Sequence, residues 1–134
     1  QDEEVYEVEE IEVAEVEEDV EVIFTAVEHV PVFPGCENDS DKKACFQKMM
    51  TKHIKRTQQY PEAAQEVGAQ GRVSVMFTIE KDGSIGNVRM RGPHASLENE
   101  ASRIIEKLPK MSPGKQRGKP VKVSFSQPIT FRLN

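Results

Sequence analysis

The feature that most constrains the fold is a period-two alternation that begins at Gly71. Four apolar residues there alternate with mostly polar ones: Val73, Val75, Phe77 and Ile79. A strand with one face on a core shows this pattern, because successive side chains point to opposite faces. Asp82-Gly83 follows, a pair that suits a tight turn because both residues tolerate the left-handed backbone region. Residues 71–90 are therefore predicted to form a β-hairpin.

The return strand of this hairpin contains an irregularity. Ile85, Val88 and Met90 supply its apolar side chains, but they shift from odd to even positions at Gly86-Asn87. One extra residue in a strand produces such a shift, so we predict a β-bulge near Gly86.

An amphipathic helix is predicted over residues 42–57. Side-chain acceptors precede it at residues 38–41, where they can cap its first turn. At 100° per residue one stripe collects these side chains: Phe46, Met49, Met50, His53, Ile54 and Thr57. Because His53 lies inside that stripe, we interpret it as a packed neighbour of the core rather than a ligand or a base.

Two further helices are predicted. Residues 60–68 form a short one, with Pro61 at its first position and Gly68 as its terminator. Residues 96–108 form the clearer one, which Pro109 ends. Its apolar positions have helical spacing: Leu97, Ala101, Ile104, Ile105 and Leu108.

Extended structure is predicted at both ends of the chain. Residues 21–27 can form a short strand with Val22, Phe24 and Ala26 on one face. Residues 121–133 read as a third long strand, interrupted by Pro128. Because proline cannot donate to a ladder, this strand is expected to lie at a sheet edge or to bend. Residues 113–120 read as a basic, flexible loop.

The charge is unevenly distributed along the chain. Residues 1–28 contain thirteen of the 23 Asp and Glu and none of the 18 Lys and Arg, so the remainder has 18 basic and ten acidic residues, a net +8. Like-charge repulsion without an apolar face predicts an extended, solvated spacer over residues 1–21, although its Val/Glu alternation would allow a strand if a partner edge were available. The chain opens with Gln1 and shows no targeting signal or membrane-spanning run, so we expect an upstream segment to be missing.

Two cysteines stand nine positions apart, at Cys36 and Cys45. In an oxidising compartment they can close a small loop. The alternative is a metal site with a histidine: His29, His53 or His94. That alternative is disfavoured, because this cysteine spacing matches no recognised zinc motif.

No catalytic constellation stands in a recognisable spacing, so we expect a non-enzymatic domain without a cofactor or a metal. One alternative is an anion or nucleic-acid site that uses Lys115, Arg117 and Lys119. It is disfavoured because no aromatic residue interleaves these charges to stack bases.

An ordered set of motifs extends through the chain: Tyr60-Pro61-x-x-Ala64, Gly71-x-Val73-x-Val75-x-Phe77, Asp82-Gly83, Asn87-Val88, Leu97-x-x-Glu100-Ala101, Pro109, Pro113-Gly114, Gly118-Lys119-Pro120-Val121 and Phe131. Together they resemble the C-terminal domain of TonB energy transducers. An upstream segment is similar to a leader found in one branch of that family: Val27-Glu28-x-x-Pro31-x-Phe33-Pro34-Gly35. The resemblance covers about residues 27–134.

The resemblance implies an α+β fold with two helices, plus an extra N-terminal helix, on one face of a three-stranded antiparallel sheet. Residues 1–21 would be the end of a periplasmic spacer, residues 22–59 a leader with the cysteine loop and amphipathic helix, and residues 60–134 the TonB-like domain. A helix upstream of this sequence would anchor the protein in the inner membrane, joined to the ExbB and ExbD motor. The oxidising periplasm would favour a Cys36–Cys45 disulfide.

The resemblance also implies how such a domain works. Its last strand would be an edge that takes up the TonB-box peptide of an outer-membrane transporter by β-augmentation. The residues expected to contact this partner are Gln58, Gln59, Tyr60, Lys119, Val121, Lys122, Val123, Ser124, Phe125 and Ser126. The rival interpretation is the TonB-like recognition domain of a membrane-bound peptidase or sensor, which would use the same edge.

Overall fold

The structure, a computed structural model, describes residues 20–134. The predicted spacer over residues 1–21 therefore lies almost wholly outside the described residues. The elements, in chain order, are β1 (Glu21–Ile23), α2 (Lys42–Thr57), α3 (Glu62–Glu66), β2 (Gly71–Ile79), β3 (Ile85–Arg91), α4 (Ala95–Glu106), β4 (Gly114–Gln116) and β5 (Lys119–Phe131).

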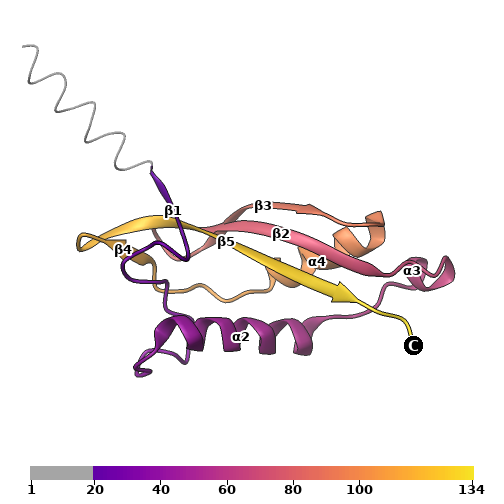
Figure 1. The fold of residues 1–134 in the computed structure, drawn as a ribbon, viewed down its shortest axis with the longest axis horizontal. Coiled ribbons are helices and arrows are strands. Elements are labelled where there is room, and N and C mark those ends of the chain that lie inside the picture. Colours follow the sequence, from indigo (N-terminus) through magenta and orange to yellow (C-terminus); the bar gives the residue numbers. More distant parts are fainter. Residues whose placement is uncertain (1–19) are drawn as a thin grey trace, which may run out of the picture.

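One sheet organises the molecule, with the strand order β1-β5-β2-β3. β2 pairs antiparallel with both β5 and β3, whereas β1 pairs in parallel with β5, and β4 pairs with the beginning of β5. The three long strands confirm the predicted antiparallel sheet, and the short β1 and β4 are additions to it. Figure 1 shows α2 and α4 on the same side of this sheet.

The core lies between the sheet and these two helices. β2 and β5 contribute alternate side chains that are all at most 7% exposed: Val73, Val75, Phe77, Ile79, Val123, Phe125, Ile129 and Phe131. Phe46 of α2 and Phe24 place their rings 5.0 Å and 4.8 Å from the ring of Phe125. Since each large apolar side chain contributes about 1.5–3 kcal/mol on burial, this layer is the main source of stability.

The hairpin forms as predicted. Its bulge falls where Met76 and Thr78 of β2 pair with Arg89 and Gly86, and Asn87 there has a φ of 48°. Gly83 in the turn has a φ of 87°, and a Cβ at that position would lie 1.6 Å from the carbonyl oxygen of Met111. Glycine is therefore required at this turn.

The three helices also form, with α2 at its predicted bounds. Its N-cap is Asp41, whose Oδ1 accepts a hydrogen bond from the Ala44 N–H at 3.0 Å. α3 is shorter than predicted, because Pro61 serves as its N-cap and Val67 as its C-cap. α4 is capped by His94.

Two predictions about segments outside the helices are wrong. The N-terminal strand ends at Ile23 rather than reaching Val27, because the N–H groups of Ala26 and Val27 both donate to the Ile23 carbonyl oxygen and turn the chain. The predicted loop over residues 113–120 is a hairpin that joins β4 to β5. Arg117 and Gly118 both have positive φ, as a two-residue hairpin turn with the twist of the strands requires.

The segment before α2 is held at several points. His29 forms a bridge with Lys115, and Val32 forms a bridge with Ser112. Cys36 and Cys45 form a disulfide, with their Cα atoms 5.9 Å apart, as the resemblance implied. The two bridges tie this segment to the region around β4, and the disulfide ties it to α2.

We expect the double substitution Cys36→Ala/Cys45→Ala to lower the free energy of unfolding by about 2–3 kcal/mol, because an open loop leaves the unfolded chain more freedom. Urea unfolding of the oxidised protein and the variant measures the loss. A reductant should destabilise the unsubstituted protein by a similar amount and leave the variant unchanged. Equal stability of all three samples would contradict the prediction.

Candidate functional site at an open strand edge

The two edges of β5 are occupied differently. One edge pairs with β2 from Val123 to Phe131 without a register shift. On the other edge, β1 pairs only with residues 122–124. Among residues 20–134, no strand pairs with that edge beyond Ser124. Residues 126–130 therefore form an open edge.

The direction of the backbone groups identifies which residues face this edge. The Phe24 N–H donates to the Ser124 carbonyl oxygen at 2.9 Å, so the backbone of Ser124 points toward β1. In a strand, alternate residues direct their backbone groups to the same edge. Since the register is continuous, Ser126, Pro128 and Thr130 present theirs to the open edge.

These groups can pair with an added strand. Ser126 and Thr130 supply N–H donors, and the carbonyl groups of all three residues supply acceptors. Pro128 has no N–H to lose, which is why proline is tolerated on this side of β5 and not on the side facing β2. Two side-chain amides donate to carbonyl groups of this edge. Gln127 Nε2 donates to the Pro128 oxygen at 2.8 Å, and Gln58 Nε2 donates to the Thr130 oxygen at 2.9 Å.

The connection between α2 and α3 lies beside the open edge. Gln58 caps α2 through its N–H, which donates to the Ile54 carbonyl oxygen at 2.8 Å. Its side chain extends to β5, where Nε2 donates to the Thr130 carbonyl oxygen. Tyr60 packs edge-on against Phe131, with ring centroids 5.8 Å apart, and its hydroxyl donates to the Ala69 carbonyl oxygen. These contacts hold the connection against the end of β5.

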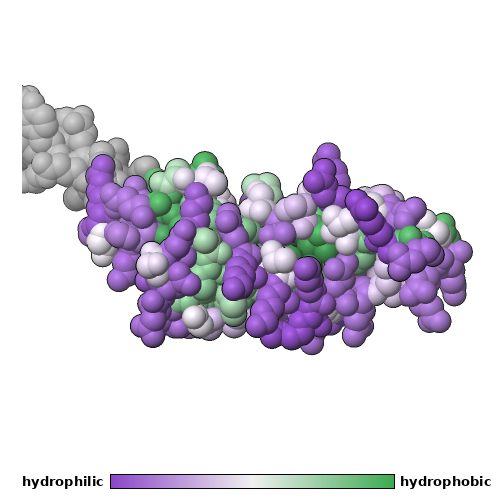
Figure 2. All heavy atoms as spheres, turned by 60° about the horizontal axis from the view of Figure 1, so that its bottom comes forward, coloured by the Kyte–Doolittle hydropathy of each residue, from purple (hydrophilic) through white to green (hydrophobic). Residues whose placement is uncertain are grey.

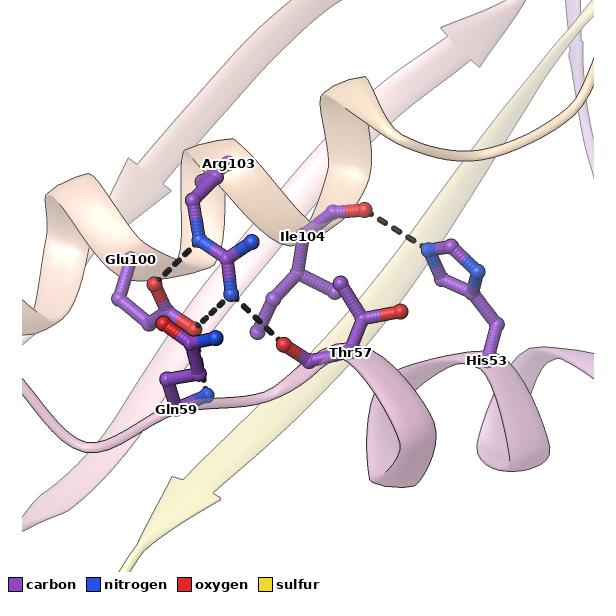
Figure 3. Close-up of polar contacts among 6 residues, drawn as sticks. All are labelled: His53, Thr57, Gln59, Glu100, Arg103 and Ile104. Carbon is purple, nitrogen blue, oxygen red and sulfur yellow. Dashed lines mark hydrogen bonds and ion pairs between the residues drawn. The ribbon is translucent and has the colours of Figure 1, made fainter.

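An ion pair on α4 fixes the same connection (Figure 3). Arg103 donates to both oxygens of Glu100 at 2.7 Å and to the Thr57 carbonyl oxygen at 2.6 Å. The Gln59 N–H donates to Glu100 Oε2 at 2.7 Å. Burial of the Glu100 carboxyl opposes ionisation, but the hydrogen bonds from Arg103 and Gln59 and the charge of Arg103 outweigh it, so its pKa is lowered.

His53 joins α2 to α4 in the same region (Figure 3). It is 4% exposed, and its Nε2 lies 2.8 Å from the Ile104 carbonyl oxygen. A carbonyl oxygen can only accept, so Nε2 carries the proton. The prediction that His53 is a packed neighbour of the core is confirmed.

The structure distributes the ten expected contact residues over four environments, of which three account for six residues. Lys119 and Val121 pair with β4, and Lys122 and Ser124 lie in the stretch paired with β1. The side chains of Val123 and Phe125 are buried in the core. The outer edge of residues 122–124 is therefore not free, because the segment before the domain supplies β1.

Ser126 is the member of the expected set that lies on the open edge, with Gln58 beside it and Gln59 and Tyr60 on the adjoining connection. The expected contact set ended at Ser126 and so left out the two other residues whose backbone groups face this edge, Pro128 and Thr130. Pro128 had indicated from the sequence that the strand lies at an edge or bends, but not which residues of the strand are free.

Other kinds of site were also considered. In the described part of the chain, no group of three or more His, Cys, Asp or Glu is placed to hold a metal ion. None of the helices in residues 20–134 is long and apolar enough to cross a membrane.

Comparison with known proteins gives three kinds of result. The family model described as Gram-negative bacterial TonB protein C-terminal matches residues 56–133. A search of curated protein sequences finds no match. Among solved structures, the chain resembles the solution structure of Helicobacter pylori TonB-CTD (residues 179-285), with 24% identity and a TM-score of 0.54, covering 75% of this chain and 91% of that one.

Two further solved structures are similar to parts of the chain. A shorter Helicobacter pylori TonB-CTD (residues 194-285) is 28% identical, with a TM-score of 0.46, over 64% of this chain and 90% of that one. The Pseudomonas aeruginosa TonB CTD is 29% identical, also with a TM-score of 0.46, over 57% of this chain and 79% of that one.

We expect Glu100→Gln to lower the free energy of unfolding at pH 7 by about 1–3 kcal/mol, because charge-assisted hydrogen bonds are lost. The lowered pKa of Glu100 means that its contribution is present above the usual carboxyl range of about 4.3 and is lost as pH falls through the folded-state value. Urea unfolding between pH 7 and pH 2 measures both effects.

The variant should lose less stability than the unsubstituted protein over this acid range. Glu66→Gln, at an exposed position on α3, is the matched control and should follow the unsubstituted protein. Parallel pH profiles for all three proteins would contradict the role given to Glu100.

Proposed function

Because the chain belongs to the family of Gram-negative bacterial TonB protein C-terminal domains, we propose that it is the periplasmic domain of a TonB-type transducer. In this proposal it binds the TonB-box peptide of an outer-membrane transporter as an added strand. It thereby couples that transporter to a proton-driven motor in the inner membrane.

The observation that carries the proposal is the open edge at residues 126–130. An unpaired edge binds an extended peptide through main-chain hydrogen bonds, which tolerate varied side chains. The exposed side chains of Ser126, Pro128 and Thr130 stand where they would contact a neighbouring strand. Pro128 interrupts the donors of this edge and so discourages pairing between two copies of the domain.

A peptide that extends past Ser126 toward Lys122 would compete with β1. β1 pairs with β5 through only three residues, and Glu21 adds one hydrogen bond, accepted from the Thr78 hydroxyl. We propose that a longer peptide displaces β1 and then pairs with Lys122 and Ser124 as well. Lys119 and Lys122 would attract an acidic peptide to this stretch.

Strand pairing suits the transmission of force. A peptide pulled along the direction of β5 would load its hydrogen bonds together rather than one at a time. β5 is itself held by nine pairs with β2, so the load would pass into the centre of the sheet. The ExbB and ExbD motor would act through a membrane helix upstream of Gln1.

We expect Ser126→Pro to weaken binding of a synthetic TonB-box peptide from a transporter of the same bacterium by about tenfold or more. The substitution removes a donor from the open edge, and tenfold corresponds to about 1.4 kcal/mol. Isothermal titration calorimetry measures the affinity, and circular dichroism during heating measures whether the fold is kept.

Ser126→Ala is the matched control, because it removes the hydroxyl and keeps the N–H. It should bind the peptide like the unsubstituted domain. Equal binding by the proline variant, in a folded domain, would argue against pairing at residues 126–130.

A second substitution tests the role of β1. We expect Val22→Pro to leave peptide affinity unchanged or to raise it, because proline there weakens pairing between β1 and β5 and frees more of the edge. The same titration measures the effect. Val22→Ala, which keeps the N–H of this position, is the matched control. A loss of affinity on freeing β1 would mean that β1 forms part of the binding surface.

A further inference from the structure

A basic ridge runs along α2 on the side of the helix that faces away from the core. α2 carries six Lys or Arg among its 16 residues and no Asp or Glu. Five of the six are exposed, and four of these lie opposite the buried stripe at 100° per residue: Lys48, Lys52, Lys55 and Arg56. Figure 2, in which the lower side of Figure 1 comes forward, shows this side largely covered by hydrophilic residues. We call these four residues the α2 ridge.

The charges of the α2 ridge repel one another. Lys48 and Lys52 are four positions apart on the helix, as are Lys52 and Arg56, and like charges at this spacing destabilise a helix. The one ion pair within residues 20–134 joins Glu100 and Arg103, so no described carboxylate neutralises the ridge. An anion from outside the described residues would relieve this repulsion.

The same chain contains a segment of complementary charge. Residues 1–19 include eleven Asp or Glu and no Lys or Arg. The segment joins β1 at Val20, and a chain of this length can reach about 60 Å at about 3.3 Å per residue. α2 is only about 24 Å long at 1.5 Å per residue, so the extended segment is more than twice as long as the helix.

We propose that residues 1–19 bind the α2 ridge of the same molecule through salt-sensitive ion pairing. A tether makes this contact favourable even when each pair is weak, because the local concentration of the segment is high. The interaction uses neither β1 nor the open edge of β5. It would draw the acidic segment back over the domain.

Other basic surfaces compete for the acidic segment: the β4–β5 hairpin with Lys115, Arg117 and Lys119, and the uncovered face of the sheet. Three arginines lie on the face of the sheet that the helices do not cover. In the strand register Arg72 pairs with Thr130, Arg89 with Met76 and Arg91 with Ser74. These cations are fewer than those of α2. Glu21 also places its carboxylate on this face, where it accepts a hydrogen bond from Thr78, so some negative charge is already present.

Paramagnetic broadening of amide signals tests the proposal in the whole chain. Val8→Cys provides a single thiol for a nitroxide label, because the two native cysteines form a disulfide. In about 0.01 M NaCl, amides of the α2 ridge should lose most of their intensity. In about 1 M NaCl they should recover it, because the Debye length falls from about 30 Å to about 3 Å.

Two triple variants with the same change in net charge locate the contact. Lys48→Glu/Lys52→Glu/Lys55→Glu should abolish the broadening on α2. Arg72→Glu/Arg89→Glu/Arg91→Glu on the open sheet face should leave it in place. The proposal would be overturned by no broadening at low salt, by the reverse result, or by equal partial losses in the two variants.

A mixed sample separates contacts within one molecule from contacts between copies. Spin-labelled chains without ¹⁵N are combined with ¹⁵N-labelled chains that carry no spin label. We expect no broadening of α2 signals in this mixture. Broadening there would show that the segment binds a second copy and would overturn the intramolecular contact.

Discussion

The antiparallel pairing of β2 with β5 is the interaction on which the rest of the structure depends. Nine consecutive residue pairs join these strands, from Gly71 with Phe131 to Ile79 with Val123. The register places the apolar side chains of both strands on one face, where they form the floor of the core. α2 and α4 pack on that floor, so the helices depend on this pairing for their buried contacts.

The same pairing decides which part of β5 is left for a partner. Odd-numbered residues of β5 direct their backbone groups to β2, and even-numbered residues direct theirs to the other edge. β1 uses the first part of that edge, and residues 126–130 remain. Because Pro128 faces this edge, the strand passes through a proline without a missing bond to β2.

Polar contacts between helices then place the surroundings of the open edge. Arg103 holds Glu100 and the carbonyl group of Thr57, and Glu100 in turn accepts from the N–H of Gln59. The chain leaving α2 is thereby fixed beside the end of β5, where Gln58 reaches Thr130. A network anchored on α4 thus positions the Gln58 side chain at the open edge.

The sequence by itself determined the elements whose signals are local. The hairpin was predicted by the alternation from Val73 to Ile79 and by the turn at Gly83, and its bulge by the shift at Asn87. The apolar stripe of α2 predicted that helix. Each of these signals reflects backbone geometry over a few residues. Only the tertiary structure decided where β5 is free. A three-residue strand such as β1 has little local signal, and its pairing depends on Phe24 entering a core built from distant segments.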